Sequence, residues 1–245
     1  GRTGPRSDER SYAGPRIDPA TNDWLFQSRK QLRAEQKDPS LRPADLTMAA
    51  ADRVVRFTSR DGVALRGWWV PAARAKPGEA SAGKPVVVLV HGLFRSALEL
   101  ERPASIFRDF GHDVFLLEMR NHGGSSRVQT TFGRDEALDV VAAVAAARER
   151  RPGPVVLYGV SLGAAAVALA LPELEDVAAV VLDAPTDDML STAHRMLNLK
   201  PVPGRRRLQI YQPWRSLLLT AIEWRFGIEL AAIDPSAGLR ALSPD

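Results

Sequence analysis

The residues best suited to do chemistry are a serine with a glycine two positions away on each side, Gly159-Val160-Ser161-Leu162-Gly163. An apolar, β-branched segment (154–158) precedes them and an Ala-rich apolar segment (164–171) follows, which predicts a strand, a tight turn and a helix. On such a turn the serine hydroxyl projects from the sheet, and the glycines avoid collisions with the neighbouring strand and helix. Ser161 is therefore predicted to be a nucleophile. The alternative is a glycine-rich turn whose serine only caps the helix.

A serine nucleophile needs a base, normally a histidine that a carboxylate orients. When the serine stands between a strand and a helix in this way, the acid and then the histidine follow it along the chain. His194 is the only histidine after Ser161, and the sequence ends at Asp245. The sequence thus supplies a nucleophile without an evident base.

A second candidate segment, His91-Gly92-Leu93-Phe94, directly follows the apolar run at residues 86–90. Strand ends of this kind are where open α/β sheets place their sites. A tetrahedral oxyanion needs two preorganised backbone N–H donors. We expect one from Leu162, which follows the nucleophile, and the other from Leu93. His91 is expected to brace the loop rather than to act as the base.

A third segment, Arg120-Asn121-His122-Gly123-Gly124-Ser125, follows a strand that is expected to end at Glu118. It is polar and rich in glycine. We expect a structural loop whose side chains hydrogen-bond the neighbouring strand ends. A catalytic His122 is the less favoured interpretation.

The elements that must position these segments alternate between strands and helices. A hairpin with its turn at Arg60-Asp61-Gly62 comes first. Buried strands are then expected at 86–90, 114–117, 154–158 and 177–182, helices at 96–110, 134–151 and 164–171, and helical segments without a clear strand at 185–240. This order predicts an α/β fold with a doubly wound, mostly parallel sheet.

Composition excludes several classes of function. The chain has no cysteine, so disulfides, thiolate metal sites and cysteine catalysis are ruled out. The net charge is +4 and basic residues lie beside acidic ones along the chain, which argues against a nucleic-acid partner. The apolar run at 154–171 contains the serine turn, so we reject a membrane span there. No signal segment is visible in the first thirty residues, and a cytoplasmic location is expected.

The domain organisation is expected to have two parts. Residues 1–47 form an N-terminal extension, partly disordered, with a short helix around 23–36. Residues 48–245 form the α/β domain, in which 185–233 is a helical insert resembling a cap.

With these segments the chain resembles the α/β-hydrolase superfamily, in the branch of soluble esterases, monoacylglycerol-lipase-like proteins and Bem46-like proteins. The resemblance covers about residues 50–245. It is carried by the three segments above together with Asp61-Gly62-Val63-Ala64-Leu65, Trp68-Trp69 and Leu182-Asp183-Ala184-Pro185. It implies a serine hydrolase that cleaves a carboxylic ester, with no metal or organic cofactor.

The chain departs from the family pattern at its end. In the family, a strand after the segment 234–244 leads to a Gly-x-x-Asp turn that carries the acid, and a later strand and loop carry the histidine. We therefore expect the last two strands and the catalytic Asp and His to lie beyond Asp245, in about 50–70 further residues. A triad of Ser161 with Asp183 and His194 is less favoured, because 191–197 is typical of an ordinary helix with a surface histidine.

The cap-like insert carries apolar residues at helical spacing. Such residues could line an acyl pocket or pack on the core. Packing is favoured, because an apolar stripe along a helix usually faces the hydrophobic core. The residues are Trp214, Leu217, Leu218, Ile222 and Phe226. Arg205-Arg206-Arg207 is expected to be a solvated loop, although the adjacent apolar helix leaves peripheral lipid contact open.

Two functions follow. The first is a serine hydrolase that transfers an acyl group from a small-molecule ester to Ser161 and then to water, with peptidase, thioesterase and lipase activities open because pocket shape sets specificity. The second is a catalytically inactive protein or fragment of the same fold that binds a ligand or partner. Its difficulty is the strand 177–182, which would form an exposed apolar sheet edge. The sequence does not fix the oligomeric state.

Overall fold

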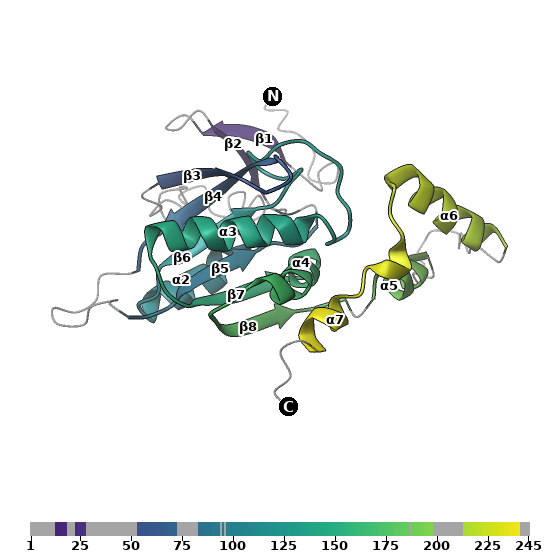
Figure 1. Cartoon of the computed structure of the whole chain (residues 1–245). Helices are drawn as coiled ribbons and strands as arrows, with labels where there is room; N and C mark the ends of the chain where they lie inside the picture. Colours follow the sequence, from purple (N-terminus) through teal and green to yellow (C-terminus); the bar gives the residue numbers. More distant parts are fainter. Residues whose placement is uncertain are drawn as a thin grey trace, which may run out of the picture.

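The computed structural model of the chain describes residues 13–18, 23–27, 53–72, 83–93, 95, 97–186, 188–197 and 213–240. Its centre is a six-stranded sheet in the order β3-β4-β6-β5-β7-β8 (Figure 1). The strands are β3 (Arg53–Thr58), β4 (Ala64–Val70), β5 (Val86–Val90), β6 (Val114–Glu118), β7 (Val155–Val160) and β8 (Val177–Asp183). The last four run parallel, and the hairpin β3–β4 joins β6 antiparallel. The predicted α/β fold with a mostly parallel sheet is confirmed.

Helices cover both faces of this sheet. The helices that the structure describes are η3 (Ala97–Leu100), α2 (Glu101–Asp109), α3 (Glu136–Arg150), α4 (Leu162–Ala170), η4 (Leu171–Glu173), α5 (Met189–Leu197), α6 (Trp214–Phe226), η5 (Leu230–Ala232) and α7 (Pro235–Arg240). One core cluster joins the sheet to α3 and α4, and a second joins its other face to η3 and α2. The sheet is therefore the middle of three layers.

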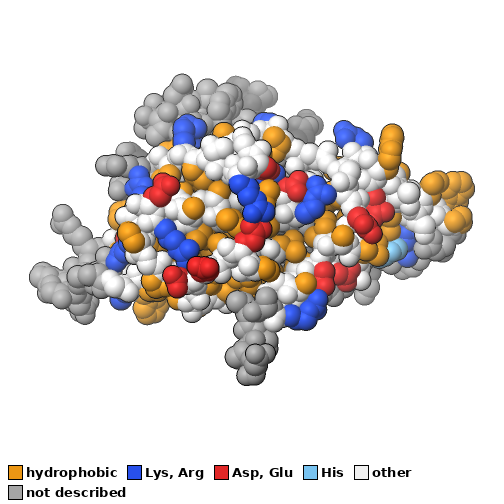
Figure 2. Space-filling model, viewed as in Figure 1, with side chains coloured by type: hydrophobic (Ala, Val, Ile, Leu, Met, Phe, Trp, Pro, Cys, Tyr) orange, Lys and Arg blue, Asp and Glu red, His pale blue; other side chains and the backbone are white. Residues whose placement is uncertain are grey.

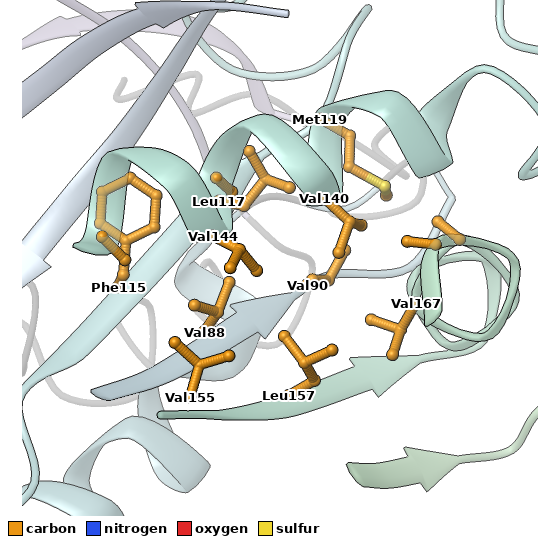
Figure 3. Packing of buried hydrophobic residues seen from close by; sticks show 14 of the residues in the cluster. Val88, Val90, Phe115, Leu117, Met119, Val140, Val144, Val155, Leu157 and Val167 are labelled. Atoms are coloured by element: carbon orange, nitrogen blue, oxygen red, sulfur yellow. The ribbon is translucent and has the colours of Figure 1, made fainter. Parts of the chain in front are cut away.

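β5 is a strand because its residues are apolar on both sides. All five (Val86–Val90) are at most 2% exposed, and they alternate between the two core clusters. Figure 3 shows Val88 and Val90 beside Val140 and Val144 of α3. A strand buried on both faces holds the loop that follows it firmly in place.

α4 is almost wholly buried, and eight of its nine residues belong to the interior. Its alanines have small side chains, which let the helix lie close to the sheet and to α3. This burial explains why the apolar run at 154–171 is a strand and a helix of the core. None of the described helices combines the length and the apolar character that a membrane crossing requires.

The N-terminal region differs from the expectation. The structure describes a hairpin of β1 (Ala13–Asp18) and β2 (Asp23–Gln27), which pair antiparallel. The predicted helix is therefore wrong at 23–27, and the rest of its range lies outside the described residues. Pairing with β1 and the strand preference of Trp24 and Phe26 explain the difference. The division into an extension and an α/β domain stays a prediction.

Beyond β8 the described residues form helices and no strand, as predicted. A third apolar cluster joins α5, α6 and η5. Ile222 and Phe226 pack against it, whereas Trp214 and Leu217 are 67% and 59% exposed. The predicted packing of the α6 stripe is thus right for part of it and wrong for those two. The arginines at 205–207 lie outside the described residues.

Candidate active site

The three candidate segments and the end of β8 meet at one edge of the sheet, because β5, β6, β7 and β8 all end there. The backbone N–H of Ser161 donates to the carbonyl oxygen of Asp183 at 2.9 Å, which ties the end of β7 to the end of β8. Gly163 lies against the carbonyl groups of Val90 and His91 at the end of β5. The fold thus gathers the predicted serine and the predicted oxyanion loop.

Ser161 has the backbone of a strained turn, with φ 52° and ψ −114°. It is exposed and directly precedes α4, yet its side chain makes no capping hydrogen bond to that helix. Among the described residues its hydroxyl has no hydrogen-bond partner. The alternative of a serine that only caps a helix therefore lacks the hydrogen bond that defines a cap.

The two flanking glycines are required by close packing. A Cβ at Gly159 would lie 2.6 Å from the carbonyl oxygen of Gly163 and 2.7 Å from the Cα of Ala164. A Cβ at Gly163 would lie 2.5 Å from the carbonyl oxygen of His91 and would also clash with Val90. Real Cβ atoms do not come so close to backbone atoms. The sequence pattern therefore has a steric cause at this turn.

The two predicted oxyanion donors follow the ends of neighbouring strands, Leu162 after β7 and Leu93 after β5. Leu162 is the first residue of α4. N–H groups of the first helical turn lack partners within the helix and lie at the positive end of its dipole. Leu93 follows β5 and packs against the main core cluster, while the N–H of Arg95 closes a turn on the carbonyl oxygen of Gly92 at 3.2 Å. The role of both amides as oxyanion donors stays a prediction.

His91 is completely buried and braces the loop. Its Nδ1 is 2.8 Å from the carbonyl oxygen of Gly92, and its Nε2 accepts the N–H of Met119 at 3.3 Å. These partners fix a neutral ring with the proton on Nδ1. Burial, and then the neighbouring His122, lower the pKa of His91 to about 3. Both ring nitrogens are engaged, so His91 has the predicted bracing role.

His122 is a second buried histidine at this edge. Its Nδ1 is 2.8 Å from the carbonyl oxygen of Arg120, and its ring meets that of His91 edge-on, with the centroids 4.8 Å apart. Burial lowers its pKa. The hydrogen bond within the loop agrees with the structural role expected for this segment.

Arg120 links three elements at the same edge. It donates to both carboxylate oxygens of Asp139 on α3 and to Asp61 in the β3–β4 turn at 2.8 Å. Burial raises the pKa of Asp139 to about 6 despite these bonds. At Asp61, burial raises the pKa, but hydrogen bonds from Arg120 and Ser59 outweigh it and leave the pKa below its usual value.

A buried ion pair that was not predicted from the sequence lies beneath this loop. Arg66 on β4 donates to Glu118 on β6 at 2.6 and 2.9 Å, and both side chains are at most 1% exposed. Glu118 also accepts the indole N–H of Trp68 at 3.1 Å and the N–H of Gly124 at 2.7 Å. Ser125 donates to the backbone carbonyl of Glu118 at 2.6 Å. The sequence signal that could have indicated this pair is a charged residue in each of two otherwise apolar strands, Arg66 in β4 and Glu118 in β6.

The structure does not assemble the triad of Ser161, Asp183 and His194. Asp183 is exposed, and its carboxylate accepts a hydrogen bond from the phenol O–H of Tyr158 at 3.3 Å. His194 lies half-buried on α5. Within the described ranges, neither side chain is hydrogen-bonded to Ser161. The four histidines of the chain all lie in those ranges, and none is a hydrogen-bond partner of the Ser161 hydroxyl.

The described residues also hold no group of three His, Asp or Glu side chains placed to bind a metal ion.

The chain matches known proteins across this region. The protein YfhR of Escherichia coli K12, itself uncharacterized, is 25% identical over 146 residues, which is 58% of this chain and 50% of that protein. The match thus spans half the length of this relative.

Solved structures extend the comparison. The Pyrococcus furiosus esterase Pf2001 in space group P212121 superposes with a TM-score of 0.54 at 26% identity, over 64% of this chain and 58% of that one. Its P21 crystal form gives a TM-score of 0.53 at 22% identity, over 77% and 68%. A sequence profile of the alpha/beta hydrolase family matches residues 87–243, from β5 to beyond α7. The chain belongs to the alpha/beta hydrolase family.

Proposed function

We propose that the chain is a serine hydrolase that cleaves a carboxylic ester at Ser161. One observation carries the proposal: an exposed serine held at φ 52° between strand β7 and the buried helix α4, without the capping hydrogen bond that would give it a structural role. This is the arrangement that presents a hydroxyl to a carbonyl group above the sheet. Similarity to the Pyrococcus furiosus esterase supports an ester as the substrate class.

The reaction has two acyl-transfer steps. Ser161 Oγ attacks the ester carbonyl carbon and loses its proton to a base, and the N–H groups of Leu93 and Leu162 bind the oxyanion. Collapse of this intermediate breaks the ester bond, the base returns its proton to the departing alcohol, and the acyl group stays on Ser161. Water then attacks the acyl group and gives a proton to the base. The bond to Ser161 Oγ breaks, Oγ regains the proton, and the carboxylic acid leaves.

A second function has its own support. No histidine of the chain is hydrogen-bonded to Ser161 in the described residues, so a non-catalytic protein that binds an acyl compound is the alternative. The proposal and the alternative differ in the reactivity of Ser161, because a base is needed to activate a serine hydroxyl.

Covalent labelling separates the two functions. We expect a fluorophosphonate probe to label Ser161 in the protein expressed from its complete reading frame. Peptide mass spectrometry locates the label, and Ser161→Ala should abolish it. Ser216→Ala, at an exposed position of α6, is the matched control and should keep full labelling. If the folded protein from the complete reading frame takes up no probe, the result contradicts the proposal and supports the binding function.

The same samples test the substrate class. A series of p-nitrophenyl esters of increasing acyl length, a thioester and an aminoacyl anilide should show the esters turned over fastest. Faster turnover of the anilide or the thioester would contradict the ester assignment.

His194→Gln and Asp183→Asn test the triad that the structure does not assemble, and both variants should keep the labelling rate of the wild type.

A further inference from the structure

Two of the four histidines of the chain lie side by side in its interior, at the edge where the strands end. His91 is completely buried and His122 is 5% exposed. Figure 2 shows a histidine at the surface near α5 and none over α3. A buried polar ring lowers stability unless its nitrogens are hydrogen-bonded, and an apolar pair would fill the same space at less cost. The pair therefore calls for a role beyond packing.

The ring of His91 joins the loop after β5 to the residue after β6. Its Nδ1–H donates to the carbonyl oxygen of Gly92 at 2.8 Å, and its Nε2 accepts the N–H of Met119 at 3.3 Å. Met119 is completely buried in the main core cluster, and Figure 3 shows it beside Val140 of α3. The Gly92 carbonyl group is thus tied, through one ring, to a residue that the core holds in place.

The Gly92 carbonyl group and the Leu93 N–H belong to the same peptide unit. A peptide unit is planar, and in its trans form the C=O and the N–H point in opposite directions. A hydrogen bond that fixes the carbonyl group therefore fixes the direction of the N–H as well. The N–H of Arg95 adds a second bond to this carbonyl oxygen at 3.2 Å. Together with that bond, the ring of His91 sets the direction of the Leu93 N–H, the proposed oxyanion donor.

His122 limits the orientation of the His91 ring. The two rings meet at 63° with their centroids 4.8 Å apart, which leaves the His91 ring little room to rotate. The Nδ1–H of His122 donates to the carbonyl oxygen of Arg120 at 2.8 Å, and its backbone N–H donates to that of Met119 at 3.1 Å. Met119 therefore bonds the ring of His91 with its N–H and the backbone of His122 with its carbonyl group.

This network is anchored on α3, outside the candidate site. The backbone N–H of Arg120 donates to the carboxylate of Asp139 at 2.7 Å, and its guanidinium donates to the same carboxylate at 2.8 Å. Asp139 is completely buried. A further bond from the guanidinium reaches Asp61 in the β3–β4 turn. The carbonyl group that receives the Nδ1–H of His122 therefore has a fixed position.

We propose that His122 is a positioning residue for the oxyanion site: it holds the ring of His91 so that the Gly92–Leu93 peptide aims its N–H at the substrate oxyanion. This rests on the proposed function, which supplies the oxyanion. A correctly aimed N–H stabilises the transition state more than the bound ester. Loss of His122 should therefore slow acyl transfer and leave ester binding almost unchanged.

Kinetics of His122→Leu test this role in the protein expressed from its complete reading frame. At pH 8 both rings are neutral, because burial lowers both pKa values. We expect kcat for a p-nitrophenyl ester to fall at least about tenfold while KM changes less than about twofold. A trifluoromethyl ketone, which forms an oxyanion on Ser161, should bind more weakly by the same factor as kcat/KM. Val144→Ala, at a buried site of α3 outside this network, is the control and should keep the wild-type kcat.

Hydrogen exchange tests the same contact without any need for catalysis. The ring of His91 protects the N–H of Met119, so the exchange of this proton, followed by NMR, should become at least about tenfold faster in His122→Leu. The amides of β5 should keep their protection, which shows that the sheet is intact. His122→Asn lacks the ring but keeps an N–H group for the Arg120 carbonyl, and it should show the same effects if His122→Leu does not fold.

The proposal is wrong if both His122 variants keep the wild-type kcat, if KM rises while kcat stays constant, or if the Met119 N–H exchanges at the wild-type rate. An equal loss of kcat in Val144→Ala would also overturn it, since a general loosening of the core would then explain the effect. Failure of the proposed function has a different signature: no fluorophosphonate labelling, in a protein whose Met119 N–H still responds to the loss of His122.

Discussion

Ser161 carries a backbone conformation that costs a non-glycine residue about 1–2 kcal/mol. The surroundings hold it there: its N–H is bonded to Asp183, and its carbonyl oxygen accepts the N–H of Ala165 at 3.1 Å. A residue that is both strained and exposed contributes little to stability by packing. The strained turn places Ser161 at the edge where the strand ends meet, and its proposed role as the nucleophile is a reason for the strain.

The first prediction concerns the glycine after this serine. Gly163→Ala should destabilise the protein by about 3 kcal/mol or more, because its Cβ would clash with backbone carbonyl groups that cannot move without disturbing β5. Gly153→Ala is the control: φ there is +130°, but no atom lies within 4 Å of the added Cβ, so a cost of about 1–2 kcal/mol is expected. Urea unfolding measures both. Equal costs would show that the close packing around Gly163 is unimportant.

The second prediction is a pH dependence of stability from His91. Its pKa is about 3 in the folded protein and near 6.5 in an unfolded chain, so the unfolded state binds more protons between these values. The stability that the protein gains from keeping His91 neutral is fully present above pH 6.5. This contribution to the free energy of unfolding falls as the pH decreases towards 3, by up to ~1.4 kcal/mol per pH unit. Buried His122, whose pKa is also lowered, acts in the same direction.

Comparison of variants isolates this effect. His91→Gln should give a shallower dependence of the unfolding free energy on pH between 6 and 4 than the wild type, measured by urea unfolding at each pH. Val88→Ala, at a completely buried site in β5 without a titrating group, should lower stability by about 1–3 kcal/mol and keep the wild-type slope. A slope for His91→Gln equal to that of the wild type would contradict the assignment.

At the scale of elements, the buried carboxylate of Glu118 joins two strands and a loop. It accepts hydrogen bonds from Arg66, Trp68 and Gly124. Glu118→Gln removes the charge that the buried guanidinium of Arg66 requires, and it should cost about 3–5 kcal/mol. Glu173→Gln breaks the exposed pair with Arg60 and should cost less than about 1 kcal/mol. Thermal unfolding compares the two, and similar costs would show that the buried pair is not needed for stability.

The elements differ in how far the sequence could predict them. β5 and the turn before α4 were predictable because their patterns are local: apolar residues on both faces, and glycines where a Cβ has no room. β2 depends on its pairing with β1, which no local pattern reveals. On α6 the regular spacing was visible, but the sequence could not show that the helix has two apolar faces and that only one packs. The partner of Arg66 lies 52 residues away, so its pairing with Glu118 depends on strand order.

At the scale of the whole molecule, the candidate site depends on four strand ends, and the strands differ in support. β5, β6 and β7 have neighbours on both sides, whereas β8 ends the described sheet. Ser161 and the loop at Leu93 were predictable because each follows an interior strand. The base could not be predicted, because its identity depends on which side chain the fold brings close to the serine. The match to the relative YfhR does not help, since it spans only half of that protein.

The position of β8 leads to the last prediction. Val180 packs on the cluster beneath α3 and α4, whereas Val181 points to the other face and is 41% exposed. A strand at the end of a sheet with exposed apolar residues invites pairing with other chains, and lysine on such a strand opposes it. Val181→Lys should therefore raise the temperature at which light scattering begins while changing the free energy of unfolding by less than about 0.5 kcal/mol. Val180→Lys should lower that free energy by about 2 kcal/mol or more, because it places a charge against the core. If Val181→Lys aggregates like the wild type, β8 is not the strand through which chains associate, and the cause must lie in another apolar surface, such as the exposed Trp214, Leu217 and Trp224 of α6.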